Sequence, residues 1–311
     1  MRGRVVVLSG GVGGAKLVLG LAHAVNPDRV TAIVNTGDDF THLGLLVSPD
    51  IDTLLYTLSG KANAAQGWGR DGESWSFMEA VKSLGGADWF LLGDGDLALH
   101  VLRTERLRRG DFLSAVIADF AKAWGIGVDI LPMSDDPVGT QVETGDGWLD
   151  FQHYFVRLRC APAVRAIRFA GAERARPAAG VLDAIADKTA RAIVIAPSNP
   201  YLSIDPILAV PGIRQALAEA TAPVVAVSPI VGGAAVKGPT AKLMQELGLA
   251  VTPGTIARHY EGLIDGLLID QRDPPESYPM ATAAADTLMK TLEDRIRVAG
   301  AALALADQLK R

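Results

Sequence analysis

A glycine-rich stretch near the start of the chain has the composition of a turn that binds a phosphate or diphosphate. The segment 9–16 reads SGGVGGAK, and it stands between the apolar run 5–8 and the helical pattern of 15–25. A strand, a glycine turn and a helix in this order let a ligand approach the backbone, where the first amides of the helix point at it. We therefore expect four residues at the phosphate: Gly11, Gly13, Gly14 and Lys16.

Two common phosphate-binding motifs do not match this stretch. The dinucleotide-binding fingerprint requires a third glycine where the chain has Lys16, which argues against a nicotinamide-dependent dehydrogenase. The phosphate loop of ATPases requires a Ser or Thr hydroxyl after the lysine, and the chain has Leu17 there. We interpret the stretch as a general anion-binding turn, and a glycine turn without a ligand stays open as the alternative.

Two pairs of aspartates follow the glycine stretch. Asp38 and Asp39 come just after the apolar run 30–34, which predicts a second strand, and Asp50 and Asp52 stand at the start of an expected helix. Parallel strands bring their carboxyl ends to one edge of a sheet, so the first pair is expected beside the glycine turn. Carboxylates are favourable next to a diphosphate when they hold Mg²⁺. For both pairs, turn formation and helix capping remain the alternative.

Polar loops in the second half of the chain supply groups that recognise a base. Ser198 and Asn199 follow a strand predicted at 192–196, and Ser228 follows one predicted at 224–227. Serine, asparagine and free backbone amides at two neighbouring strand ends are able to bind the edge of a nucleobase. Ordinary proline turns are the alternative interpretation of these loops.

The middle of the chain is less regular. We expect a helical insertion at 50–125 that caps the site, with a short strand at 89–92 that ends in the run GDGD at 93–96. The sequence GDG at 145–147 predicts a β-hairpin, which would add an antiparallel pair at a sheet edge. The basic side chains at 100–109 are interpreted as a solvated helix face.

Composition excludes several classes of function. The 311 residues carry a formal net charge of −5 with no basic run, which argues against nucleic-acid binding. No apolar stretch is long enough for a membrane span, and the start of the chain does not resemble a signal peptide. The single cysteine, Cys160, fits a reducing cytoplasm, so a cytoplasmic location is expected.

The order of the predicted elements indicates the fold. Strands and helices alternate, and several strands are apolar throughout, which is typical of a parallel sheet covered on both faces. We predict one α/β domain over 1–311, with a Rossmann-like three-layer core and a mainly parallel sheet. The Ala- and Leu-rich tail at 282–309 is predicted to be helical, and its apolar stripe is interpreted as core or as a subunit interface.

Six of these segments together resemble the 2-phospho-L-lactate transferases of coenzyme F-420 biosynthesis, a family that includes phosphoenolpyruvate-using forms in bacteria. The resemblance runs from the first residue to about 273 and extends into 285–289. The matching segments occur in the order of the family: 9–17 (SGGVGGAKL), 34–39 (VNTGDD), 48–53 (SPDIDT), 131–138 (LPMSDDPV), 197–200 (PSNP) and 227–230 (VSPI).

The resemblance implies a reaction. A guanosine diphosphate ester of 2-phospholactate, or its enolpyruvyl form, is the donor, and the ribityl hydroxyl of the deazaflavin Fo attacks the phosphorus distal to guanosine so that GMP leaves. It also implies Mg²⁺ and a homodimer. Asp52, in the family's Ser-Pro-Asp-x-Asp-Thr motif, is the candidate for binding the deazaflavin and orienting its hydroxyl. For this reaction we expect Asp94 as a second catalytic residue, Ser134 and Asp135 at the deazaflavin, and Asp50 and then Asp39 at the metal. Gly11, Gly13, Gly14, Lys16, Ser198, Asn199 and Ser228 are assigned to the donor nucleotide.

One departure from the family pattern bears on specificity. We associate a basic residue with the middle of the family's Gly-Asp-x-Asp motif, and this chain has Gly95 there. A different three-carbon acid, such as 3-phosphoglycerate, therefore stays open. A second function also stays open, a regulatory sugar-nucleotide-binding protein similar to the gluconeogenesis factors. Those proteins follow the Asp-Asp pair with a Gly-Gly-Ser-Ser-Gly-Arg run, which 40–45 does not match.

Overall fold

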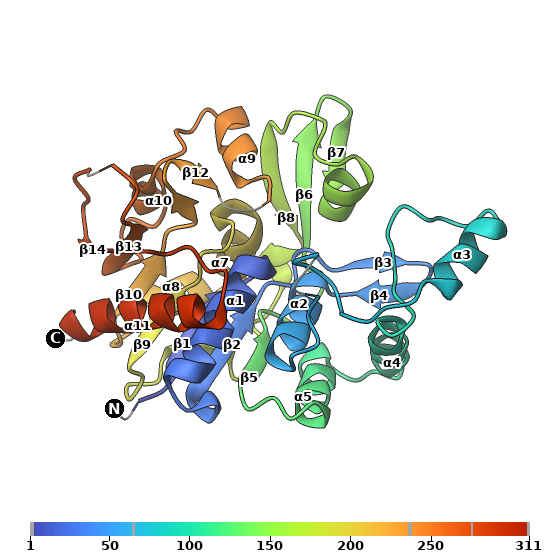
Figure 1. The fold of residues 1–311 in the computed structure, drawn as a ribbon, viewed down its shortest axis with the longest axis horizontal. Coiled ribbons are helices and arrows are strands. Elements are labelled where there is room, and N and C mark those ends of the chain that lie inside the picture. The colour runs from blue at the N-terminus through green and yellow to red at the C-terminus, as the bar shows by residue number, and fades with distance from the viewer. Residues whose placement is uncertain (1–2, 64–65, 236–237, 275, 310–311) are drawn as a thin grey trace.

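The computed structural model describes residues 3–63, 66–235, 238–274 and 276–309, and its centre is a seven-stranded sheet (Figure 1). Its strands follow the order β14-β13-β10-β9-β1-β2-β5, and every neighbouring pair is parallel. The predicted parallel α/β core is thus confirmed. The strands are β1 (Val5–Ser9), β2 (Val30–Val34), β5 (Asp129–Pro132), β9 (Ala192–Ile195), β10 (Val224–Val227), β13 (Gly266–Asp270) and β14 (Ala281–Ala285).

Helices cover both faces of this sheet, because its central strands are apolar on both sides. Val5 and Val7 of β1 face one apolar core, and Val6 and Leu8 face the other. The first core is closed by α1 (Gly11–Ala24), α2 (Pro49–Leu58), α5 (Leu113–Ala123) and α11 (Leu292–Gln308). The second is closed by α6 (Val181–Ile185), α7 (Asp205–Ala209), α8 (Ile213–Ala218), α9 (Thr240–Glu246) and α10 (Pro253–His259).

The C-terminal part differs from the prediction of one continuous helix. Residues 281–285, with the sequence ATAAA, form β14, and this strand pairs in parallel with β13 at the edge of the sheet. Alanine favours helices, but the open edge of β13 offers hydrogen-bond partners that outweigh the local preference. The helix α11 begins only after Thr291, which forms a capping box with Asp294. Its apolar stripe packs on α1 and is core.

The predicted hairpin is confirmed, but it does not extend the main sheet. Strands β6 (Gly139–Thr144) and β7 (Gly147–Asp150) pair in antiparallel fashion, and β8 (Ala166–Ala170) joins β6 on its other side. They form a separate three-stranded sheet, seen above the core in Figure 1. A five-residue π-helical turn, His153–Arg157, follows β7.

The segment between α2 and α5 projects from the core on the right of Figure 1. It contains α3 (Ser76–Ser83) and α4 (Leu97–Arg108), and the two-stranded sheet of β3 (Phe40–His42) and β4 (Leu45–Val47) runs alongside. The strand predicted at 89–92 is wrong, because these residues are irregular and their aromatic rings pack against Phe40 and His42 instead of pairing in a sheet. The helix α2 belongs to the core, so the insertion begins after α2 and not at residue 50 as predicted. That the whole chain forms a single domain stays a prediction.

One further short hairpin lies near the carboxyl end of β10, formed by β11 (Ile230–Val231) and β12 (Ala234–Ala235). Among the described residues, no helix is long and apolar enough to cross a membrane.

Candidate functional site

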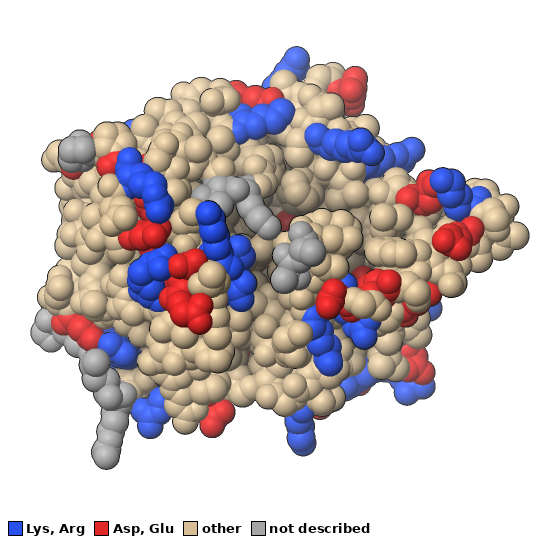
Figure 2. Space-filling model, in the orientation of Figure 1, with Lys and Arg blue, Asp and Glu red and all other residues tan. Residues whose placement is uncertain are grey.

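A cavity of about 700 Å³ lies at the carboxyl ends of the central strands. Its wall includes the loops that follow β1, β9 and β10, and the strand order reverses on either side of β1. Open α/β sheets bind their ligands at such a position. Figure 2, in the orientation of Figure 1, shows that the surface is hollowed near the centre of the view. The fold therefore brings the glycine turn and the polar loops of the second half together, as their predicted places at strand ends require.

The glycine turn forms one wall of the cavity. The helix α1 begins at Gly11, four residues before the predicted start, and Gly11 has a φ of 62°. A Cβ atom on Gly13 would lie 2.7 Å from the carbonyl oxygen of Pro197, so only glycine fits there. Gly14 packs against Ser9 behind the wall instead of lining it. Lys16 lines the cavity, and its ammonium donates to the carbonyl of Met289 at 2.7 Å.

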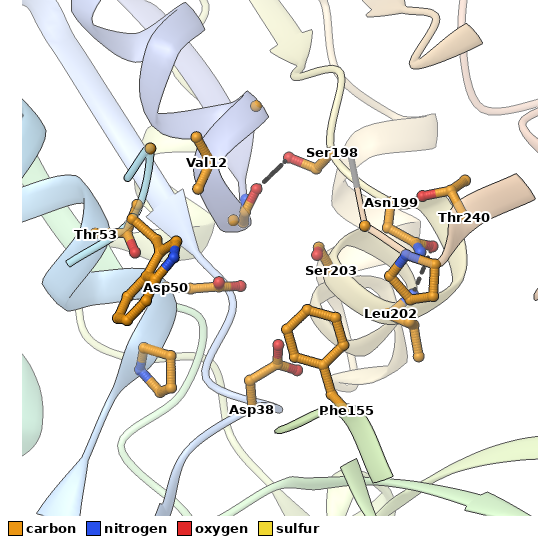
Figure 3. Close-up of a pocket in the computed structure, with 18 of the residues that line it drawn as sticks. Val12, Asp38, Asp50, Thr53, Phe155, Ser198, Asn199, Leu202, Ser203 and Thr240 are labelled. Atoms are coloured by element: carbon orange, nitrogen blue, oxygen red, sulfur yellow. Dashed lines mark hydrogen bonds between the residues drawn. The ribbon is translucent and has the colours of Figure 1, made fainter. Parts of the chain in front are cut away.

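The carboxylates of Asp38 and Asp50 point into the same space (Figure 3). Both side chains are buried, and the Asn35 amide donates to Oδ2 of Asp50 at 2.9 Å. Burial raises the pKa of Asp50 to about 6. Burial, together with the charge of Asp50, raises the pKa of Asp38 well above its usual value. Two carboxylates held so close without a cation are an electrostatically unfavourable arrangement.

Asp39 is not among the residues that line the main cavity. The hydroxyl of Ser48 donates to its Oδ2 at 2.8 Å, and its carboxylate lines a smaller neighbouring cavity of about 400 Å³. Asp38 and Trp89 line both cavities. The structure therefore brings Asp50 together with Asp38 at the main cavity, whereas the sequence pointed to Asp39 as the second metal ligand.

The residues at this point fit a magnesium ion. Oδ1 of Asp38 is buried and has no hydrogen-bond partner in the described part of the chain. No group of three or more His, Cys, Asp or Glu side chains among the described residues is arranged to hold a metal. Mg²⁺ needs no such group, since it is usually bound by one or two carboxylates together with substrate phosphates and water.

Asp52 belongs to a buried network that the sequence analysis missed. The guanidinium of Arg103 binds both of its carboxylate oxygens, with Nη1 at 3.2 Å from Oδ2. His100 is also buried, with Nε2 3.0 Å from Asp96 and Nδ1 3.8 Å from Asp52. Tyr56 donates its hydroxyl to Asp96. The side chains at 100 and 103 come from α4, where their basic character alone indicated a solvated face.

The pKa values of this network reflect its contacts. Burial raises the pKa of Asp96, but the adjacent imidazole of His100 and the hydrogen bond from Tyr56 outweigh it and bring the value below the usual one. Burial lowers the pKa of Arg103, and the adjacent Asp52 more than offsets that effect. Asp96 and Arg103 are therefore both held in their charged forms. The cation that Asp52 faces at the cavity wall is the guanidinium of Arg103.

Asp94 lies elsewhere. Its carboxylate accepts hydrogen bonds from the Ser74 hydroxyl and from the amides of Ser76 and Phe77 at the start of α3, so it caps that helix. The hydrogen bond from Ser74 is the first cause of a lowered pKa for Asp94. Of the two aspartates of the Gly-Asp-x-Asp run, it is Asp96 that lines the main cavity.

The two other residues assigned to the deazaflavin also form internal bonds. Ser134 is buried and donates to the carbonyl of Arg176 at 2.7 Å. Asp135 accepts from the amide and the hydroxyl of Ser114 at the start of α5. Neither residue is among those that line the main cavity. Their hydrogen bonds position the loop after β5, and the cavity wall is formed by other side chains.

The polar loops lie opposite the glycine turn. Ser198 donates to the carbonyl of Gly10 at 2.7 Å and accepts from its amide at 3.1 Å, which ties the two loops together (Figure 3). Asn199 caps the turn after it, and its Nδ2 is buried without a hydrogen-bond partner among the described residues. Ser228 lines the cavity, and its hydroxyl accepts from the Ile230 amide.

Aromatic side chains form the remaining wall. They come from the insertion and from the turn after β7, segments that are far apart in the sequence. Only their three-dimensional arrangement reveals them as a group, since no spacing in the sequence connects them. The rings of this wall are Trp68, Trp89, Phe90, Phe151 and Phe155, and Tyr56 of α2 also lines the cavity.

Gly95 packs against an ion pair from the same insertion. A Cβ atom on Gly95 would lie 2.2 Å from Nη1 of Arg70, and its amide donates to Glu73 at 2.6 Å. Arg70 and Glu73 are themselves paired at 3.0 Å. Arg70 occupies the space that a side chain at position 95 would need. A longer residue at this position would therefore displace the ion pair.

The chain is similar over most of its length to proteins of one known family. Residues 5–307 match the family described as "2-phospho-L-lactate transferase CofD". Proteins named phosphoenolpyruvate transferase from Kitasatospora aureofaciens and Streptomyces griseus are each 46% identical to the chain, over 99% of both sequences. One from Streptomyces coelicolor is 43% identical, again over 99% of both.

The fold comparison points to a second group of proteins. A crystal structure of a UPF0052 family member from Bacillus halodurans superposes with a TM-score of 0.62 and 19% identity, covering 97% of this chain and 99% of the other. At that identity the likeness concerns the fold. The family match and the transferase relatives together establish that this chain belongs to the 2-phospho-L-lactate transferase (CofD) family.

Proposed function

We propose that this protein transfers a phosphoenolpyruvyl or 2-phospholactyl group from its guanosine diphosphate ester to the ribityl hydroxyl of the deazaflavin Fo. The observation that carries the proposal is that one cavity combines a glycine turn, two facing carboxylates and an aromatic wall. A diphosphate, a metal ion and a flat ring system are the three partners that these features fit. The names of the relatives from Kitasatospora aureofaciens and Streptomyces coelicolor favour the phosphoenolpyruvyl group.

The reaction forms one bond and breaks one. The hydroxyl oxygen of Fo bonds to the phosphorus distal to guanosine, and the bond from that phosphorus to the GMP oxygen breaks. The hydroxyl proton is released, and the products are GMP and a phosphodiester that joins the acid to Fo. Positioning and charge stabilisation supply most of the catalysis in such a transfer.

Each wall of the cavity has a part in this scheme. The amides that begin α1 and the ammonium of Lys16 bind the diphosphate, while Asn199 and Ser228 lie where guanine is recognised. Asp38 and Asp50 are the side chains that would hold Mg²⁺, and the ion would supply positive charge beside the phosphate oxygens.

The acceptor side is formed by the aromatic wall and the buried network of α4. The rings cover the deazaflavin, and Asp52 accepts a hydrogen bond from the ribityl hydroxyl. Because Arg103 occupies one side of each Asp52 oxygen, the remaining lone pairs have a fixed direction. Asp52 thus acts by orienting the hydroxyl toward the phosphorus.

Binding of Fo, measured by its fluorescence with and without GDP and Mg²⁺, tests the proposal. We expect saturable binding of Fo that GDP with Mg²⁺ strengthens, because donor and acceptor share one cavity. A protein that binds a uridine diphosphate sugar, and under no condition binds Fo, would contradict the transferase and support the regulatory alternative.

A further inference from the structure

The charges that line the main cavity are unevenly distributed. Asp38, Asp50, Asp52 and Asp96 supply carboxylates on the side of α2 and the insertion. The proposed donor carries a diphosphate and a carboxylate, so it needs cations as well as a metal ion. Among the described residues, Lys16 and Arg159 are the lysine and arginine side chains that line the cavity.

Of these two cations, Arg159 is the one without a function so far. The ammonium of Lys16 already donates to the carbonyl of Met289. The guanidinium of Arg159 is exposed, and in the described parts of the chain it makes no hydrogen bond or ion pair with any other group. An arginine presents five N–H donors in a planar fork that suits a carboxylate or a phosphate.

Arg159 lines the cavity from a strained stretch of backbone. Arg159 and Cys160 have φ values of 50° and 55°, and they are consecutive residues other than glycine. Such a conformation is unfavourable for a residue that has a side chain, and it persists only where the surroundings impose it.

The surroundings that impose it are visible. The Cys160 amide donates to the carbonyl of the buried Tyr154 at 3.0 Å, and the Leu158 amide donates to the carbonyl of His153 at 3.0 Å. The strained pair follows the π-helical turn His153–Arg157, whose Phe155 also lines the cavity. π-Helical turns occur frequently at functional sites.

We propose that Arg159 binds an anionic group of the donor, either its carboxylate or a phosphate of its diphosphate. The inference rests on the proposed function, and it identifies a specificity residue that no motif in the sequence indicated. A guanidinium at the wall of a cavity that is otherwise rich in carboxylates favours donors that place a negative charge at that point.

The test compares Arg159→Gln and Arg159→Lys with a matched control, Arg157→Gln. Arg157 lies two residues earlier in the same turn and is exposed, but it does not line the cavity. For each protein, the Kd of GDP in the presence of Mg²⁺ and the KM of the enolpyruvyl ester of guanosine diphosphate are measured. Affinity for Fo and the melting temperature serve as readouts that a donor-binding role leaves unchanged.

We expect Arg159→Gln to raise the KM of the ester about 10- to 100-fold, since it removes a hydrogen-bonded charge pair. We expect Arg159→Lys to restore part of this loss and Arg157→Gln to behave as the wild type. If the Kd of GDP rises equally, the bound group is a phosphate, and if GDP binds normally, it is the carboxylate. A KM within twofold of wild type for Arg159→Gln would overturn the inference. Failure of the wild type to bind GDP would instead refute the proposed function, and this inference with it.

Discussion

Arg103 of α4 holds both carboxylate oxygens of Asp52 of α2, and both side chains are buried. The contact joins the insertion to the core at the wall of the cavity. Arg103 also donates to the Leu46 carbonyl of β4 at 3.4 Å, so three segments meet at one guanidinium. The desolvation penalty of a buried ion pair offsets most of the attraction between its charges, so the pair adds little net stability. Removal of one partner, however, leaves an uncompensated buried charge.

Arg103→Met is therefore expected to destabilise the protein by about 3–5 kcal/mol, because it leaves the Asp52 carboxylate buried without a cation. Urea unfolding of the variant measures the loss. The double variant Arg103→Met/Asp52→Asn removes the stranded charge and is expected to recover part of the stability. A single variant within about 0.5 kcal/mol of wild type would show that the pair has no structural role.

Asp50→Asn is expected to lower turnover of Fo with the donor ester roughly 100-fold, since the metal site loses a charged ligand beside the diphosphate. Titration of activity against Mg²⁺ at a fixed pH measures the effect. Asp146→Asn, on the exposed turn between β6 and β7, is the control and should keep wild-type activity. An Asp50→Asn protein with unchanged magnesium dependence would remove Asp50 from the metal site.

The raised pKa of Asp50 predicts how stability depends on pH. In the folded protein burial raises this pKa to about 6, against an ordinary value of 3.8. Between these values the folded state binds more protons than the unfolded state, so stability is gained as pH falls through 6 and is lost as pH rises through 6.

Wild-type stability, compared with that of Asp50→Asn, should therefore rise between about pH 7 and pH 5, measured by urea unfolding without metal. Magnesium affinity should fall over the same range, because the ligand must lose its proton to bind the ion. A stability difference that does not change with pH would show that Asp50 titrates in the ordinary range.

Much of the fold was predictable from the sequence, because the apolar runs at 5–8, 30–34, 192–196 and 224–227 report burial on both faces of a sheet. The strand β14 was not predictable in the same way. Its five residues consist of alanine and threonine, and only the free edge of β13 makes them a strand.

The candidate site, like the fold, was predictable from the sequence only in part. The glycine turn and Asp50 follow predicted strands or begin predicted helices, so their position was accessible from the sequence. Arg103 and Arg159 were not, since an arginine in a helix or loop carries no sign of burial or of the cavity that it faces. Asp94 and Asp96 occupy equivalent places in one short run, and only the capping of α3 separates their roles.

Trp68→Ala is expected to weaken Fo binding about 10-fold, because an aromatic contact with the deazaflavin is lost. Trp68 is 53% exposed, so the variant should fold normally. Trp148→Ala is the control, since Trp148 is 37% exposed and stacks on Arg168 away from the main cavity. Fluorescence titration with Fo compares them, and equal affinities would exclude Trp68 from the acceptor site.

Gly13→Ala is expected to impair GDP binding and to destabilise the glycine turn, because its Cβ would lie 2.7 Å from the carbonyl oxygen of Pro197. Calorimetric titration with GDP and Mg²⁺ measures the loss. Gly300→Ala in α11 is the matched control and should keep GDP affinity. Among the described residues, no atom beyond the adjoining residues and backbone of its own helix lies within 4 Å of the added Cβ atom. Normal GDP binding by Gly13→Ala would place the diphosphate elsewhere.

The most direct test of the transferase is the reaction itself. The purified protein is incubated with Fo, Mg²⁺ and the enolpyruvyl or phospholactyl ester of guanosine diphosphate, and the products are identified by mass spectrometry. We predict equal amounts of GMP and of an Fo derivative whose mass has increased by that of the phosphorylated acid less one water molecule. Unchanged Fo with both esters, in a protein that is folded and binds GDP, would contradict the proposed function.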